Sequence, residues 1–199
     1  MKIQWLAMLF GVILVMSLSG CRSHGGVESP YTPMGEANRN TVEAERLTRQ
    51  AAELMERNPA KAESLLREAL SKDLYHGPAH NNLGVLLLSR GDLYAAASEF
   101  EFARKLMPGH PDPRINLALT LERAGRTDEA MRNYKAAMEV YPEHISAIQG
   151  LVRLQMRHGR RDDRTDRLLS EVALRGETEE WRTWAQQLIA AAEAPVQER

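Results

Sequence analysis

The sequence predicts an all-α fold, in which about four helical hairpins stack into a solenoid and a C-terminal helix caps the last one. The first observation is a 34-residue period, because residues 81–110 align with residues 115–144 without a gap. The second is a set of glycines and prolines in register, placed where a hairpin needs its turn and its end: Gly91, Gly125, Pro108 and Pro142. The third is that these repeats follow an apolar N-terminus and a spacer rich in glycine and proline.

The N-terminus has the pattern of a secretory signal. Lys2 is the only charged residue before Arg22, and the run from Ile3 to Leu18 is nearly all apolar. A positive start, an apolar run of about 15 residues and then small residues are typical of a signal peptide, whereas a membrane span needs ~20 apolar residues. We therefore predict a signal peptide over residues 1–20. The alternative is an uncleaved anchor with a chance cysteine.

The four residues Leu18, Ser19, Gly20 and Cys21 resemble the lipobox of bacterial lipoproteins at every position. The resemblance implies cleavage before Cys21, a diacylglycerol on its thiol and an N-acyl chain on the new amine. Two or more acyl chains hold a protein firmly at a membrane. In enterobacterial lipoproteins an aspartate after the cysteine retains the protein in the inner membrane. Arg22 stands there instead, so the resemblance implies the outer membrane, facing the periplasm.

A lipidated, flexible tether is predicted over residues 21–41. Its sequence is dominated by Gly, Pro, Ser and Asn and shows neither a helical nor an alternating period. About 20 such residues give a reach of roughly 25 Å and at most ~65 Å. We expect the repeat array to follow over residues 42–178 and to stand away from the bilayer, with a short tail over 195–199.

The repeated positions resemble the tetratricopeptide repeat, which has Leu-Gly in its first helix and Ala-x3-Phe, Ala and Pro in its second. The units 77–110 and 111–144 carry most of this pattern: Leu83, Gly84, Ala96, Phe100, Ala103 and Pro108, and then Leu117, Ala118, Ala130, Tyr134, Ala137 and Pro142. Small residues let two helices approach to ~8–10 Å. The outer units 43–76 and 145–178 match weakly, as terminal units do because they present a polar outer face.

A final helix is predicted over residues 178–194. Arg175 and Gly176 have the form of a helix stop, and Thr178 has that of an N-cap. Four apolar side chains fall on one face of this helix: Trp181, Trp184, Ala185 and Leu188. We expect this helix to cap the last hairpin. The alternative is that its tryptophans make it a binding helix.

The sequence carries no recognisable catalytic motif, phosphate-binding loop or metal-binding motif. A net charge of -1 creates no field that attracts nucleic acid. His76, His110 and His144 recur every 34 residues, and successive hairpins hold them too far apart to share one metal ion. Cys21 would lack a packed base in a flexible spacer. We predict no enzyme, no metal and no cofactor besides the lipid. An enzyme with an unrecognised site is the less favoured alternative.

In tetratricopeptide arrays the first helix of each hairpin lines a concave face that binds partner peptides, so the resemblance implies such a groove here. Residues at i, i+3 and i+7 share a helix face and predict its lining: Asn82, Val85, Asn116, Leu119, Arg123, Arg153 and Arg157. The asparagines suit a peptide backbone, and the arginines suit a carboxylate or acidic segment. The alternative is that such residues are simply frequent at these positions. A two-carboxylate clamp is not implied, because Leu47 and Ala51 occupy slots that would need Lys and Asn.

Together these features predict a lipid-anchored scaffold or adaptor whose partners are proteins or peptides of the cell envelope. By resemblance to lipoproteins of this kind, the first specific expectation is a pilotin-like role in pilus or secretin assembly. The second is an adaptor that brings peptidoglycan hydrolases and proteases together. The sequence predicts no nucleic-acid partner and leaves self-association into a homo-oligomer open.

Overall fold

The computed structural model describes residues 39–193, and within that range the chain forms nine α-helices and no strand. The signal peptide, Cys21, nearly all of the tether and the tail at 195–199 lie outside the described residues. In chain order, the helices are α1 (Thr41–Leu54), α2 (Pro59–Lys72), α3 (Gly77–Ser89), α4 (Leu93–Leu106), α5 (Asp112–Arg123), α6 (Thr127–Val140), α7 (Ile145–Arg157), α8 (Asp163–Arg175) and α9 (Glu179–Glu193).

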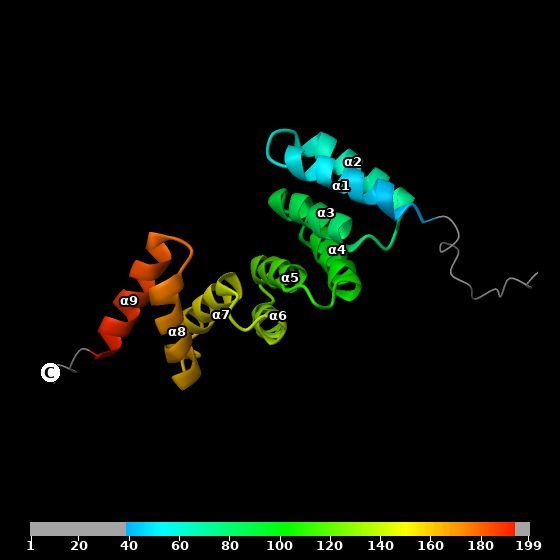
Figure 1. Cartoon of the computed structure of the whole chain (residues 1–199). Coiled ribbons are helices and arrows are strands. Elements are labelled where there is room, and N and C mark those ends of the chain that lie inside the picture. Colours follow the sequence, from blue (N-terminus) through cyan, green and yellow to red (C-terminus); the bar gives the residue numbers. More distant parts are fainter. Residues whose placement is uncertain (1–38, 194–199) are drawn as a thin grey trace, which may run out of the picture. The chain divides into compact units, whose positions relative to one another are not determined.

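The helices pair into four hairpins, and α9 packs against α8 at the end of the array (Figure 1). Each first helix also contacts the first helix of the next hairpin, so α1, α3, α5 and α7 form a continuous row. The predicted all-α hairpin repeat with a final capping helix is therefore confirmed.

Glycines in the left-handed region close three of the four hairpins. Gly91 has φ 86°, Gly125 has φ 73° and Gly159 has φ 63°, a conformation that costs glycine little because it has no Cβ. The first hairpin has a different turn, in which the Asn58 side chain accepts a hydrogen bond from the backbone N–H of Lys61 at the start of α2. The sequence accordingly has no glycine here in register with Gly91.

The core of each central hairpin depends on an aromatic ring against a small residue. Phe100 of α4 is fully buried, and a Cβ at Gly84 of α3 would lie 2.6 Å from its Cε1 atom. Tyr134 occupies the equivalent place in the third hairpin and is 2% exposed. The spacing of small and aromatic residues thus sets how closely neighbouring helices pack.

His80 is a structural residue of the second hairpin. Its Nδ1 lies 2.6 Å from a carboxylate oxygen of Glu99, and its Nε2 lies 2.9 Å from the carbonyl oxygen of Leu74. Burial lowers the pKa of His80, but the hydrogen bonds to Glu99 and Leu74 outweigh burial and raise it. The side chain therefore joins α3 to α4 and to the loop before α3.

The start of the array is clamped by a buried carboxylate. The Asp73 side chain accepts hydrogen bonds from Arg39 Nε at 2.8 Å, from the Thr41 hydroxyl at 3.0 Å and from the Tyr75 N–H at 3.0 Å. Burial raises the pKa of Asp73, but these donors prevail and lower it. The backbone N–H of Asn40 also donates to the carbonyl of Lys72. The entry to α1 is therefore fixed to the end of α2.

Candidate functional site

The row of first helices carries every groove residue that the sequence predicts. Asn82 and Val85 lie on α3, and the others lie on α5 and α7: Asn116, Leu119, Arg123, Arg153 and Arg157. All seven are half-buried or exposed. Because α3, α5 and α7 contact one another in order, these residues occupy three consecutive neighbours in the row.

The asparagines form a polar link between α3 and α5. Asn116 Nδ2 donates to Asn81 Oδ1 at 3.1 Å, and Asn81 Nδ2 lies 3.5 Å from Asn82 Oδ1. The sequence did not single out Asn81. Within residues 39–193, the side-chain oxygen Oδ1 of Asn116 and the amide nitrogen Nδ2 of Asn82 have no hydrogen-bond partner, so each side chain keeps a group that a peptide backbone could use.

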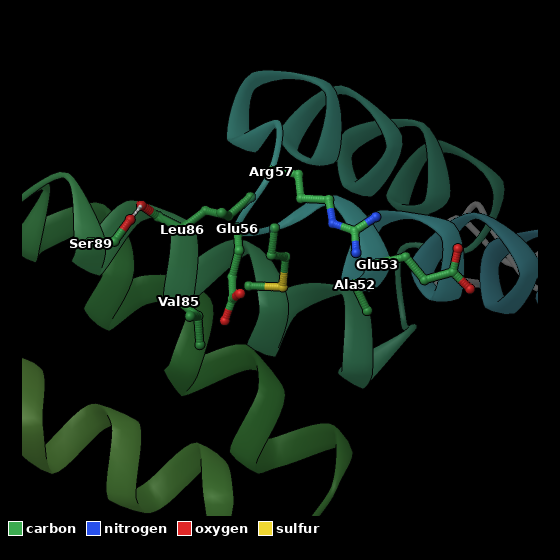
Figure 2. A pocket seen from close by; sticks show the side chains of 8 residues that line it. Ala52, Glu53, Glu56, Arg57, Val85, Leu86 and Ser89 are labelled. Carbon is green, nitrogen blue, oxygen red and sulfur yellow. Dashed lines mark hydrogen bonds between the residues drawn. The ribbon is translucent and has the colours of Figure 1, made fainter.

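A hollow of about 490 Å³ lies between the C-terminal end of α1 and the neighbouring face of α3 (Figure 2). We call it the α1–α3 hollow, and its lining comes from α1, from the turn after it and from α3: Ala52, Glu53, Met55, Glu56, Arg57, Val85, Leu86 and Ser89. Val85 is the predicted groove residue among them. The α1 side was not anticipated, because the first repeat has Arg49 and Gln50 where the Leu-Gly signal belongs.

The predicted basic end of the groove contains an internal carboxylate. Glu122 of α5 lies 2.5 Å from Arg153 Nη2 and 3.1 Å from Arg157 Nη1, and its side chain is 10% exposed. Two of the three predicted arginines are thus already paired. Arg123 is exposed, and its Nη1 donates to the carbonyl of Leu88 at 3.3 Å.

Tyr134 of α6 lies beside this charge cluster. Burial raises the pKa of Tyr134 to about 12, the charge of Glu122 adds to the effect and that of Arg153 opposes it. The ring also lies against Gly150 of α7, where an added Cβ would overlap it. The cluster therefore joins α5, α6 and α7, and its first role is to hold these helices together.

The tryptophans of α9 face α7. The Arg153 guanidinium lies 5.7 Å from the centre of the Trp181 ring. The rings of Trp181 and Trp184 pack edge to face, with their centres 5.4 Å apart. Both rings are half-buried and pack on the core, while Ala185 is fully buried. Their remaining surface lines a shallow cleft of about 290 Å³ together with Arg153, Thr178 and Glu180. The contacts are those of a capping helix.

Within residues 39–193, no group of three or more His, Cys, Asp or Glu side chains is arranged to hold a metal ion. His76 and His144 each lie 3.4 Å from a single carboxylate, that of Glu45 and that of Asp112. None of the helices in this part of the chain is long and apolar enough to span a bilayer.

A model of the protein kinase G tetratricopeptide repeat family matches residues 28–193 of the chain. The chain belongs to this family. The tetratricopeptide resemblance seen in the sequence is thereby confirmed. A tetratricopeptide array is a scaffold for protein–protein interaction, and that is the general role of this fold.

Two curated relatives share part of this tetratricopeptide chain. Tetratricopeptide repeat protein 8 of Mus musculus is 30% identical over 100 residues, which cover 49% of this chain and 19% of that protein. The protein of the same name from Caenorhabditis elegans is 30% identical over 76 residues, which cover 38% and 14%. The matches therefore span less than a fifth of each relative.

Solved structures share the fold of the tetratricopeptide array. The first TPR of Spaghetti (RPAP3) bound to the HSP90 peptide SRMEEVD has a TM-score of 0.58 at 14% identity, covering 61% of this chain and 98% of that one. MamA has a TM-score of 0.57 at 18% identity, covering 78% and 83%. The thermophilic TPR protein TTC0263 of Thermus thermophilus has a TM-score of 0.60 at 17% identity, covering 75% and 83%. At these identities the likeness shows the fold alone.

Proposed function

We propose that this protein is a lipid-anchored adaptor of the cell envelope that holds a segment of a partner protein along the row α1, α3 and α5. The observation that carries the proposal is the α1–α3 hollow, which opens between two neighbouring first helices and includes Val85. The RPAP3 array, which has a similar fold, is bound to an HSP90 peptide, so a short peptide is a ligand that this fold accommodates.

The proposed contacts follow the helix row. Val85 and Leu119 are half-buried against the core and offer apolar surface, while Asn82 and Asn116 offer amide groups to a peptide backbone. Arg123 adds an exposed positive charge. A partner carboxylate would reach the two arginines of α7 only in competition with Glu122, so we assign those arginines a supporting role.

The anchor is proposed at Cys21, with the outer membrane as its site. The lipobox residues carry this part of the proposal, together with the 18 positions that separate Cys21 from Arg39 at the start of the described array. At about 3.5 Å per residue such a segment spans ~60 Å at most. An anchored array could therefore meet partners at the membrane or within the nearby periplasm.

Cys21→Ala should abolish lipid attachment. Radiolabelled palmitate should enter the wild-type protein and be absent from the variant, because the alanine side chain offers no thiol for the diacylglycerol. The variant should also leave the outer-membrane fraction. His24→Ala, three residues further on, is the matched control and should label normally. Palmitate that persists in Cys21→Ala would contradict the anchor.

Val85→Arg combined with Leu119→Arg should reduce partner capture from envelope extracts by about tenfold or more, because two charges would replace the apolar part of the groove. Capture by the lipidated protein is measured by cross-linking and mass spectrometry, and circular dichroism checks that helicity is kept. Tyr94→Arg with Leu174→Arg is the control, since these side chains are 93% and 77% exposed and lie on α4 and α8.

The identity of the captured protein decides the pathway. We propose a pilotin-like role, for which secretin or pilus subunits are the expected partners. Peptidoglycan hydrolases or proteases would instead support the second adaptor role. Equal capture by the groove variant and the wild type would refute binding in this groove.

A further inference from the structure

The α1–α3 hollow combines an apolar floor with carboxylates that are not paired within the described part of the chain. Ala52, Met55, Val85 and Leu86 provide the apolar atoms. Glu53 and Glu56 are exposed, and neither forms an ion pair with another of residues 39–193. This differs from the opposite end of the row, where the carboxylate of Glu122 is taken up by two arginines.

Arg57 is the one cation in the lining of the hollow, so the lining carries a net charge of -1 from two carboxylates and one guanidinium. Figure 2 shows the Glu56 carboxylate pointing toward Val85, with the Arg57 guanidinium on the other side of the hollow. The apolar floor therefore has an uncompensated carboxylate beside it. A ligand with an apolar stem and a positive charge would pack on the apolar floor and pair with the carboxylate.

Both carboxylates stand at the C-terminal end of α1. Glu53 lies in the last turn of α1, which has no basic residue, and Glu56 follows Met55, the C-cap residue of the helix. The C-terminus of a helix carries partial negative charge and is stabilised by cations rather than anions. Two acidic residues there work against the local stability of α1. Departures from a local folding rule are expected where a function requires them.

We infer that the α1–α3 hollow binds a lysine- or arginine-bearing segment of the partner protein. The methylene stem of the basic side chain lies along Met55 and Val85, and its charged end meets Glu56, with Glu53 adding to the negative potential. Met55 adapts to different apolar neighbours, because its side chain is flexible and unbranched. This inference rests on the proposed function, since it names the chemistry of the segment held in the same groove.

The test compares two acetylated and amidated octapeptides by calorimetric titration of the mature chain from Cys21 in detergent micelles. Both peptides contain two leucines, and their remaining common positions are glycine and serine. The first peptide, the lysine peptide, also has two lysines. The second peptide, its twin, has two glutamates at the same two positions. The lysine peptide should bind the wild type at least about tenfold more tightly than its twin. This preference should shrink as the salt concentration rises, because exposed charges are screened.

Glu53→Lys with Glu56→Lys should reverse the preference between the two peptides. The thermal midpoint of this variant should stay equal or rise, because lysine suits a helix C-terminus, so weaker binding cannot be ascribed to unfolding. Glu68→Lys with Glu139→Lys is the matched control. It makes the same change in net charge at exposed positions of α2 and α6 and should keep the wild-type preference.

Three results would overturn the inference: equal binding of both peptides, a preference that the Glu53 and Glu56 reversal leaves unchanged, or no binding of either peptide at millimolar concentration. These results are separable from failure of the adaptor role. If capture from envelope extracts still depends on Val85 and Leu119 while the lysine peptide shows no preference, the adaptor function stands and only the chemistry of its segment is wrong.

Discussion

Arg153→Glu combined with Arg157→Glu should lower the free energy of unfolding by roughly 3–5 kcal/mol. The two arginines compensate Glu122, whose side chain is 10% exposed, and the change would gather three carboxylates at one place. Loss of the Arg153 contact with the Trp181 ring would also loosen α9. Urea denaturation followed by circular dichroism measures the effect.

The matched control reverses two arginines whose ion pairs are exposed. Arg160 pairs with Asp128 and Arg175 with Glu171, and all four side chains are about half exposed. Exposed pairs contribute about 0–1 kcal/mol each, so Arg160→Glu with Arg175→Glu should change stability far less. If the two double variants were equally stable, the ion pairs of Glu122 with Arg153 and Arg157 would contribute no more to the free energy of unfolding than exposed ion pairs do.

Arg153 and Arg157 have a structural role as well as a place in the groove. A charge reversal at Arg153 and Arg157 removes capacity for an acidic partner and at the same time destabilises the helices around it. Lost capture in that variant would therefore not distinguish binding from folding. Arg123 is exposed and donates to a backbone carbonyl, so Arg123→Glu is the cleaner probe of positive charge in the groove.

Gly150→Ala should lower the free energy of unfolding by about 2 kcal/mol, although glycine to alanine in an open helix stabilises by about 0.5–1 kcal/mol. The new Cβ would overlap the Tyr134 ring and lie 2.8 Å from its hydroxyl oxygen. The ring cannot move aside easily, because it is 2% exposed and lies beside the Glu122 cluster. Thermal and urea unfolding both measure the change.

Gly109→Ala is the control for this substitution. An added Cβ at Gly109 meets no atom within 4 Å, so the variant should be close to the wild type in stability. Replacing Tyr134 by phenylalanine would not relieve the overlap in Gly150→Ala, because ring carbons as well as the hydroxyl oxygen meet the Cβ. A Gly150→Ala protein as stable as Gly109→Ala would show that the α6–α7 approach is adjustable.

The hairpins were predictable because their signals are local. Turn glycines such as Gly91 and packing pairs such as Gly84 with Phe100 lie within one hairpin, and the 34-residue period repeats them in the next one. The same helical spacing placed all seven groove residues on first helices. Predictions about the signal peptide, Cys21 and the tether concern residues outside the described structure and stay predictions.

The pairing of Glu122 with Arg153 and Arg157 was not predictable by the same means. It joins residues 31 and 35 positions apart on different helices, and whether they meet depends on how α7 is rotated against α5. Helical spacing gives the face of a residue but not the rotation of its neighbour. The α1–α3 hollow was missed for a different reason, because its acidic side lies in the first repeat, which is one of the two outer repeats that match the pattern weakly.

The clamp at Asp73 has a mechanical consequence if the chain is anchored at Cys21. Force applied through the tether reaches the array at Arg39, which is bonded to Asp73 beyond the end of α2, while Asn40 is bonded to Lys72. Tension is therefore shared by both helices of the first hairpin instead of peeling α1 away from α2. If a moving partner pulled on an anchored adaptor, α1 would stay packed in the first hairpin. The α1–α3 hollow, which α1 helps to form, would therefore stay intact under tension.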